Sequence, residues 1–497
     1  MSIPDENPEL AEGSLKHRAA RGAVWIALQS TSTQATSFVV FAVMAHFVEP
    51  SDFGLLSISL LVVFSLKALL LDNVAAAVVR KSRATNLEYT TAFWITIGLS
   101  ALASGAMLLI SLWSDRLFHA PGLARVMMAM SAVLLFMGLG RTHEAWMSRH
   151  FKFRALAIRS VVGAVIGGCI GVVLAASGYG VEALVAQQVT TSIVWFVLVL
   201  VTCSWRPELR FSVKASMEIL LFLRSVVANA AIGVVTGNCD TFLVAYFFGP
   251  ASTGIYSIGK RLTLAIQLVA AAPVGGVVWP ALLEVQDDRE RYRRILLRAL
   301  ALICAVCGPV FIGASAVSNE AIVIVFGQKW EAAGPVLALL AIGGLAQILL
   351  FYGYEVFVIH NRQIWSFYVS LVYAVLAIAL FQLSVYFGFH YIALPFVLPY
   401  GVVCPLTAVL ISRLVALSAR DWFGALAPGL GASVVMFVVV RLAALLLDGV
   451  GDVGRLSILC LIGCVVYVGT LWMVGRDTAK MVLDLGHKLV HRRAKPR

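Results

Sequence analysis

Charged side chains are scarce in this 497-residue sequence, at 13% of its residues, while hydrophobic residues make up 60%. The mean hydropathy is +0.91. A chain with so few polar residues cannot cover the surface of a water-soluble domain. The composition therefore excludes a soluble domain and predicts a polytopic membrane protein.

Motifs for catalysis and metal binding are absent as well. The sequence has no H-E-x-x-H pair, no Walker-type glycine loop and no Ser/His/Asp order. Cys304 and Cys307 have zinc-like spacing, but no second pair accompanies them. All eight cysteines lie in or beside apolar segments, where they act as small hydrophobic residues. We therefore expect no catalytic residue, no metal, no cofactor and no disulfide.

Long apolar segments are abundant. Fourteen of them can be drawn, each close to the length that crosses a bilayer as a helix. The predicted fold is therefore an all-α polytopic membrane protein with about 14 transmembrane helices. The segments lie near residues 21–48, 53–79, 90–113, 126–147, 155–177, 183–204, 225–248, 254–283, 295–317, 332–358, 366–387, 392–411, 425–447 and 456–474.

The basic residues support this count, because successive connections between the segments are alternately rich and poor in Lys and Arg. Most of the 38 Lys and Arg residues fall on one side, and the other side holds Arg116, Arg125, Lys329 and Arg455. Since basic loops remain cytoplasmic, both termini of this multi-pass protein are predicted in the cytoplasm. Topology and anionic lipid headgroups then explain the net charge of +12, and no nucleic-acid partner is expected.

An internal repeat is visible at an offset of 200 residues. Residues 47–58 and 247–258 share Phe, Pro, Gly, Ser and Ile at equivalent places. The match predicts two pseudo-symmetric six-helix lobes in the same orientation, a parallel repeat, although two apolar hairpins can also match by chance. The expected organisation is a cytoplasmic tail (1–20), an N-lobe (21–204), a cytoplasmic linker (205–224), a C-lobe (225–420), two C-terminal helices (421–475) and a basic cytoplasmic tail (476–497).

The hairpin around Pro250 carries three charges inside the predicted membrane. Asp240 lies ten residues before Pro250 and Lys260 ten residues after it, so antiparallel helical arms would bring the two charges to one depth. A lone charge at that depth costs about 2.5 to 3.5 kcal/mol. Asp240 can offset this cost for one cation, because Lys260 and Arg261 point about 100° apart on a helix. One spare cation is therefore expected.

The second helix carries two further charges. Lys67 lies mid-way along this helix, and Asp72 follows five residues later. On an α-helix this spacing does not put the two side chains on one face, so each is predicted to meet a partner from another helix. Lys67 is a second candidate cation for a cavity. Other intramembrane charges are interpreted as structural, namely Arg141 with Glu144, Arg441 with Asp448, and Glu355 near His360 and Arg362.

Polar residues mark one face of the first helix and one of the seventh. Gln29 begins a run of amide and hydroxyl side chains in the first helix, and Asn229 occupies the matching place in the seventh. Such faces line either a watery cavity that can bind sugar hydroxyls or a close contact between helices. On the seventh helix the polar stripe consists of Asn229, Gly233, Thr236 and Asp240. We favour the cavity for this helix, because the stripe ends in the charged residue Asp240.

Six short motifs follow one another along the chain, namely AHFVEPSDFGLL (45–56), TAFW (91–94), RHFKFR (149–154), GYGVEALV (178–185), PAL (280–282) and GQKWEAA (327–333). In this order they resemble the Wzx-type polysaccharide flippases. That family belongs to the superfamily that also holds multidrug-efflux (MATE) carriers and the lipid II flippase. The resemblance runs from about Leu15 to Arg420 and is closest to the exopolysaccharide branch.

The resemblance implies a flippase that carries an undecaprenyl-diphosphate-linked oligosaccharide from the cytoplasmic to the periplasmic leaflet of the bacterial inner membrane by alternating access. It also implies a central cavity lined by helices one, two, seven and eight, in which cations receive the diphosphate. Polysaccharide polymerase or export machinery is an expected partner. The substrate-binding candidates are Lys67, Lys260, Arg261, Asp240, Gln29 and Asn229, and the ion-coupling candidates are Asp240 and Asp72.

Other functions remain open from the sequence. A MATE-like ion-coupled antiporter of small molecules would use the same fold, but it would need an anionic cavity. A membrane polysaccharide polymerase or glycosyltransferase would need a sizeable periplasmic loop, and the longest predicted outer connection, near residues 318–331, is too short to fold alone. A non-transporting scaffold would tolerate every change of the intramembrane charges.

Overall fold

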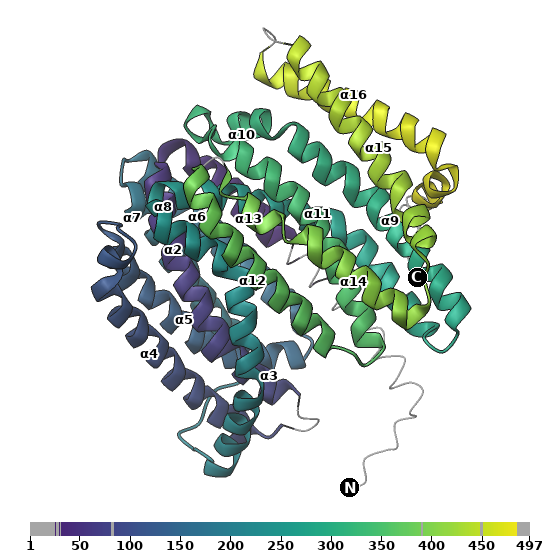
Figure 1. Cartoon of the computed structure of the whole chain (residues 1–497). Helices are drawn as coiled ribbons and strands as arrows, with labels where there is room; N and C mark the ends of the chain where they lie inside the picture. Colours follow the sequence, from purple (N-terminus) through teal and green to yellow (C-terminus); the bar gives the residue numbers. More distant parts are fainter. Residues whose placement is uncertain are drawn as a thin grey trace. The chain divides into compact units, whose positions relative to one another are not determined.

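The computed structural model describes Trp25, Gln29 and residues 31–80, 84–388, 391–447 and 451–484. For residues 225, 229, 271–280, 383, 385 and 387 it describes the backbone but not the side chains. These described residues form helices joined by short connections, and no strand is found among them (Figure 1). The predicted all-α class is confirmed.

The chain divides into two compact units, residues 1–254 and 255–497. The first unit begins with a helix over residues 31–47. Within this unit α4 packs along α5, and α6 packs along α7. Its further elements are α2 (Pro50–Leu66), η1 (Lys67–Leu71), α3 (Asp72–Val79), α4 (Asn86–Leu117), α5 (Leu123–Arg149), α6 (Phe153–Ala176) and α7 (Gly180–Thr202). The predicted lobe and linker boundaries stay predictions.

The second unit has its main core between α9, α11, α14 and α15, where side chains such as Ile303, Phe311, Phe357 and Val403 are fully buried. In the same unit α15 also packs along α16. The elements are α9 (Arg289–Ala316), α10 (Ser318–Phe326), η2 (Gln328–Trp330), α11 (Ala333–Ile359), α12 (Ile364–Phe387), α13 (Leu394–Val397), α14 (Tyr400–Val415), α15 (Ala419–Leu446) and α16 (Asp452–Val474).

Local sequence signals explain where several helices begin. Pro50 opens α2, because proline fits the first turn of a helix, where its missing N–H is not needed. Thr85 and Glu88 form a reciprocal capping box at the start of α4. Ser418 and Asp421 do the same for α15. Each box satisfies backbone N–H groups that the first helical turn leaves without partners.

The helix α8 (Val213–Glu284) contributes to both units. It is interrupted at Gly249, whose φ of 76° and ψ of −174° are not helical. Residues with a Cβ atom rarely adopt this conformation, so glycine is required there. The predicted turn between the seventh and eighth helices therefore lies at Gly249 and Pro250.

Gly54 and Gly254 occupy equivalent places in the two matching stretches of sequence. A Cβ atom on Gly54 would lie 1.7 Å from the backbone oxygen of Pro250, and one on Gly254 would lie 1.9 Å from the backbone oxygen of Pro50. Such close approaches are possible for glycine alone. A two-fold relation between residues 47–58 and 247–258 would produce reciprocal contacts of this kind. They support the parallel repeat, which stays a prediction.

Twelve helices among the described residues are long and apolar enough to cross a membrane. This number counts α8 once, although Gly249 interrupts it, and it leaves out the first helix. The membrane class is therefore confirmed, and the number of fourteen spans stays a prediction.

Candidate functional site

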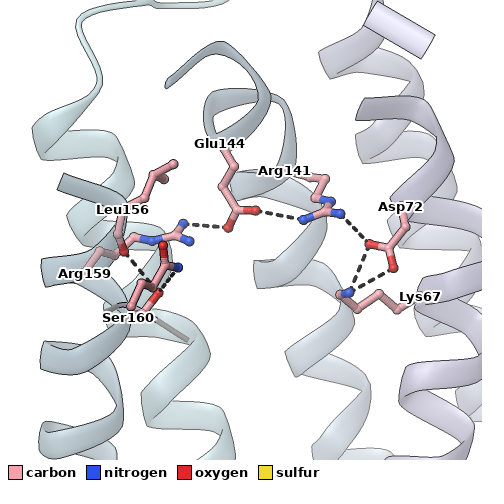
Figure 2. Close-up of polar contacts among 8 residues, drawn as sticks. Lys67, Asp72, Arg141, Glu144, Leu156, Arg159 and Ser160 are labelled. Atoms are coloured by element: carbon pink, nitrogen blue, oxygen red, sulfur yellow. Dashed lines mark hydrogen bonds and ion pairs between the residues drawn. The ribbon is translucent and has the colours of Figure 1, made fainter. Parts of the chain in front are cut away.

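Five ionised side chains form a continuous chain across η1, α3, α5 and α6 of the first unit (Figure 2). The Lys67 Nζ atom lies 3.0 Å from the Asp72 carboxylate, and Asp72 Oδ1 lies 2.7 Å from Arg141 Nη2. Arg141 Nη1 lies 2.9 Å from Glu144 Oε2, and Glu144 Oε1 lies 2.6 Å from Arg159 Nη1. Three cations alternate with two carboxylates in this set, which we call the ion chain. It carries one net positive charge.

The pairing of Lys67 with Asp72 results from η1, which is a π-helical turn. The backbone N–H of Asp72 donates to the carbonyl oxygen of Lys67, five residues earlier. A π turn therefore aligns residues five apart, whereas an α-helix would separate them by about 140°. The prediction that the two charges do not share a face is wrong. The predicted partner from another helix is present for Asp72, since it also binds Arg141.

One end of the ion chain is open and the other is buried. The side chains of Lys67, Asp72 and Arg141 are 26%, 32% and 28% exposed, whereas Arg159 is 6% exposed. All five charges lie in helices that are apolar enough to span a membrane. Pairing offsets the cost of a lone intramembrane charge, which is about 2.5 to 3.5 kcal/mol. The open end is where another molecule could reach the cations.

The buried end of the ion chain is supported by aromatic and polar neighbours. The Arg159 guanidinium lies 5.6 Å from the centre of the Trp195 ring, a cation–π contact. Ser160 donates to the Leu156 carbonyl at 3.0 Å and accepts a hydrogen bond from Gln29 at 2.9 Å (Figure 2). Gln29 also lines a cavity of about 220 Å³ between the first helix and α6. The structure thus brings the predicted residue Gln29 to the edge of the ion chain.

The sequence analysis missed Arg159 as a site residue. Basic residues near the start of a helix are typical of a cytoplasmic flank, so Arg159 was counted with the flanking residues of its helix. Arg159 nevertheless falls inside the predicted span 155–177, and a cation inside a span is the signal that could have identified it. The predicted pair of Arg141 and Glu144 is present, but it also connects Asp72 to Arg159. The interpretation of Arg141 and Glu144 as a purely structural pair is therefore incomplete, because the pair also joins the two ends of the ion chain.

The predicted charges of the α8 hairpin fall in different units. Asp240 is half-buried in the first unit and accepts hydrogen bonds from the backbone N–H and the hydroxyl of Thr241, at 2.7 and 3.2 Å. Lys260 and Arg261 belong to the second unit. The pairing of Asp240 with Lys260 therefore stays a prediction. The side chain of Asn229 lies outside the described residues.

The charges of the second unit that were interpreted as structural have other contacts. Arg441 donates to the last carbonyl of α9 at 3.5 Å, and Asp448 lies outside the described residues. Within the described ranges no ion pair joins Glu355 to His360 or Arg362. His360 instead contacts a backbone carbonyl of its own helix end at 2.9 Å. Among the described residues no group of three His, Cys, Asp or Glu side chains could hold a metal ion.

Among the known proteins that this chain is similar to, one family and two relatives bear on this arrangement. A family model described as "Polysaccharide biosynthesis protein" matches residues 43–335. The lipopolysaccharide biosynthesis protein WzxC of Escherichia coli (strain K12) is 25% identical over 335 residues, which are 67% of this chain and 68% of WzxC. The succinoglycan biosynthesis transport protein ExoT of Rhizobium meliloti (strain 1021) is 24% identical over 322 residues, 65% of each chain. The chain thus spans about two thirds of the length of these curated relatives.

Structural comparison gives similar solved proteins. The lipid II flippase MurJ, in an inward closed conformation, matches with a TM-score of 0.72 and 14% identity, over 90% of this chain and 98% of MurJ. An inward-facing multidrug resistance transporter of the MATE family matches with a TM-score of 0.57 and 12% identity, over 79% of this chain and 98% of that transporter. At such identities the likeness shows the fold alone. Together the matches confirm the expected resemblance to Wzx-type proteins and the expected fold.

Proposed function

Because this chain belongs to the polysaccharide biosynthesis protein family, we propose that it is a flippase for lipid-linked oligosaccharides rather than an enzyme. Its substrate would be an undecaprenyl-diphosphate-linked repeat unit, moved across the bacterial inner membrane by alternating access. The names of its relatives WzxC and ExoT, and the MurJ-like fold, support this function. The product would feed exopolysaccharide or lipopolysaccharide synthesis.

The observation that carries this proposal is the open end of the ion chain. Lys67 and Arg141 converge on one oxygen, Asp72 Oδ1, at 3.0 and 2.7 Å. A diphosphate offers negatively charged oxygens of the same kind, and ammonium and guanidinium groups are the donors that bind phosphate in proteins. A phosphate oxygen would therefore replace the carboxylate oxygen as the anion that the two cations share.

Asp72 would act as the internal anion of the empty site. With the substrate absent it pairs with both cations, and with the substrate bound it is displaced. A proton on Asp72 would remove its charge and release the same two cations. This chemistry supports the assignment of Asp72 as an ion-coupling residue.

A second set of substrate contacts is proposed on α8. Lys260 and Arg261 would bind the diphosphate as well, and Asp240 would pair with one of them or exchange a proton. Asn229 on α8 and Gln29 on the first helix would hydrogen-bond the sugar. The three charged assignments rest on the resemblance and on the cost of intramembrane charge, and the two amide assignments rest on the polar faces of these helices.

The membrane arrangement is proposed from the distribution of basic residues. Both termini would face the cytoplasm, as the positive-inside rule indicates. Polysaccharide polymerase or export machinery would receive the translocated repeat unit. An antiporter of organic cations is disfavoured, because the ion chain has more cations than carboxylates.

Flipping by the reconstituted full-length protein tests the proposal. The probe is the lipid-linked oligosaccharide that accumulates in cells lacking the chain, labelled on its sugar and placed in one leaflet of liposomes. We expect Lys67→Ala and Arg141→Ala to abolish most flipping, and Lys260→Ala and Arg261→Ala to slow it. Arg210→Ala, which removes a cation that is 78% exposed outside the spans, is the control and should flip normally.

The outcomes distinguish an error in the proposed site from an error in the proposed function. Flipping by the wild type with normal rates in both Lys67→Ala and Arg141→Ala would remove the ion chain from the substrate path. The function itself would be rejected if no lipid-linked repeat unit accumulated on deletion, or if such a lipid accumulated and the wild type did not flip it.

A further inference from the structure

Two glutamines form an exposed pair within the apolar helices of the second unit. Gln267 Nε2, on α8, donates to Gln347 Oε1, on α11, at 2.6 Å. Gln347 is exposed and Gln267 is half-buried. A primary amide has two N–H donors and two acceptor sites on its oxygen. Within the described ranges the two side chains make no other hydrogen bond, so most of their capacity is unused.

The position of this pair indicates what surrounds it. Gln347 lies midway along α11, which is apolar and long enough to span a membrane. Hydrocarbon cannot satisfy the unused amide groups, and leaving them unpaired there is unfavourable. The pair therefore faces water or a polar ligand, and a watery face inside a membrane protein is a candidate pathway for a polar substrate.

The same face of α11 continues with side chains suited to a sugar. Phe351, Tyr354 and Glu355 follow Gln347 at four, seven and eight residues, which places them on one helical face. Phe351 is 57% exposed. The Tyr354 hydroxyl lies 3.0 Å from the Ser370 hydroxyl. Tyr354 is half-buried and also packs against the core of the second unit, which the opposite face of α11 enters.

We infer that Gln267, Gln347, Phe351, Tyr354 and Glu355 form a glycan face that binds the oligosaccharide of the translocated lipid. Sugar hydroxyls both donate and accept hydrogen bonds, as the free amide groups do. The apolar side of a sugar ring can pack on the exposed Phe351 ring. The inference rests on the proposed flippase function and adds a sugar contact in the second unit to those proposed for Gln29 and Asn229.

Binding to two lipids tests the glycan face. The full-length protein in nanodiscs is titrated with the lipid-linked repeat unit from cells lacking the chain, and separately with undecaprenyl diphosphate that carries no sugar. The variant is Gln267→Met with Gln347→Met, since methionine has a similar length, favours helices and suits lipid. The matched control is Gln382→Met, because Gln382 is exposed on α12 about 18 Å along that helix from Ser370.

We expect the wild type to bind the glycosylated lipid more tightly than the bare one. The double variant should lose about tenfold in affinity for the glycosylated lipid, the effect of one or two hydrogen bonds, with no change for the bare lipid. The control should match the wild type.

Three results would overturn the glycan face. An unchanged preference for the glycosylated lipid in the double variant does so directly. Equal binding of both lipids by the wild type removes the glycan face and leaves the diphosphate site standing. Binding of neither lipid by the wild type rejects the proposed function, and the glycan face with it.

Discussion

Asp72→Asn is the most direct test of the ion chain. The substitution keeps the shape of the side chain and removes the negative charge that Lys67 and Arg141 share at 3.0 and 2.7 Å. Three cations then face one remaining carboxylate, that of Glu144. We expect the variant to bind diphosphate anions more tightly than the wild type, because no internal anion competes for the two cations.

The size of this effect follows from the exposure of the three side chains. Each is between a quarter and a third exposed, so solvent weakens each ion pair to about 0.5 to 1 kcal/mol. An incoming anion must replace two such pairs in the wild type and none in the variant. Removing the competitor should therefore tighten binding by about 1 to 2 kcal/mol, or about 5-fold to 30-fold.

Calorimetric titration with inorganic pyrophosphate measures this difference. Low salt is needed, because partly exposed ion pairs are screened at higher ionic strength. The control is Asn73→Ala, which removes a 3.2 Å hydrogen bond to the Ala68 carbonyl in the same π turn and changes no charge. Its affinity should equal that of the wild type. Equal or weaker binding of pyrophosphate by a folded Asp72→Asn protein would refute the shared-anion reasoning.

The remaining predictions concern the π turn, a glycine contact and the buried end of the ion chain. Deletion of Ala68 places Lys67 and Asp72 four residues apart on an α-helix, where their side chains still meet, so flipping should persist. A separate variant with one alanine inserted after Ala68 places them six residues apart, where they do not meet, and should abolish flipping. Gly54→Ala brings a Cβ atom to 1.7 Å from a backbone oxygen and should lower stability by about 2 kcal/mol or more in thermal unfolding, whereas Gly98→Ala, with nothing within 4 Å, should be neutral. Arg159→Gln should cost about 1 to 3 kcal/mol in the same measurement, because the half-buried Glu144 carboxylate loses one of two cations.

The membrane spans could be predicted from the sequence because lipid imposes a length and a composition on them. The predicted segments 90–113 and 126–147 lie inside α4 and α5. Helix ends in water follow other signals. Residues 86–89 extend α4 beyond its apolar segment because Thr85 and Glu88 cap it.

The π turn could not be predicted. Lys67–Leu71 contains no proline or glycine, and its residues are ordinary helix formers. A sequence pattern reports the period of an α-helix, and a π turn adds one residue to that period without a local signal. Asp72, which follows the turn, is held by an ion pair with Arg141 on a different helix, and such a contact is not visible from spacing.

The site itself was partly predictable. Lys67 and Asp72 could be singled out because charge inside an apolar span is costly and needs a partner. The identity of the partners could not be read from the sequence, because it depends on which helices are neighbours. Gln267 and Gln347 lie 80 residues apart, and the sequence analysis singled out neither of them.

An internal anion suits a carrier because the substrate must also leave. Without Asp72, Lys67 would lose its carboxylate in the ion chain, and Arg141 would share the Glu144 carboxylate with Arg159 whenever the site is empty. With Asp72, a diphosphate oxygen replaces a carboxylate oxygen, so the empty and loaded states have similar ion pairs and the free-energy difference between them stays small. The displaced carboxylate must then face water or take up a proton.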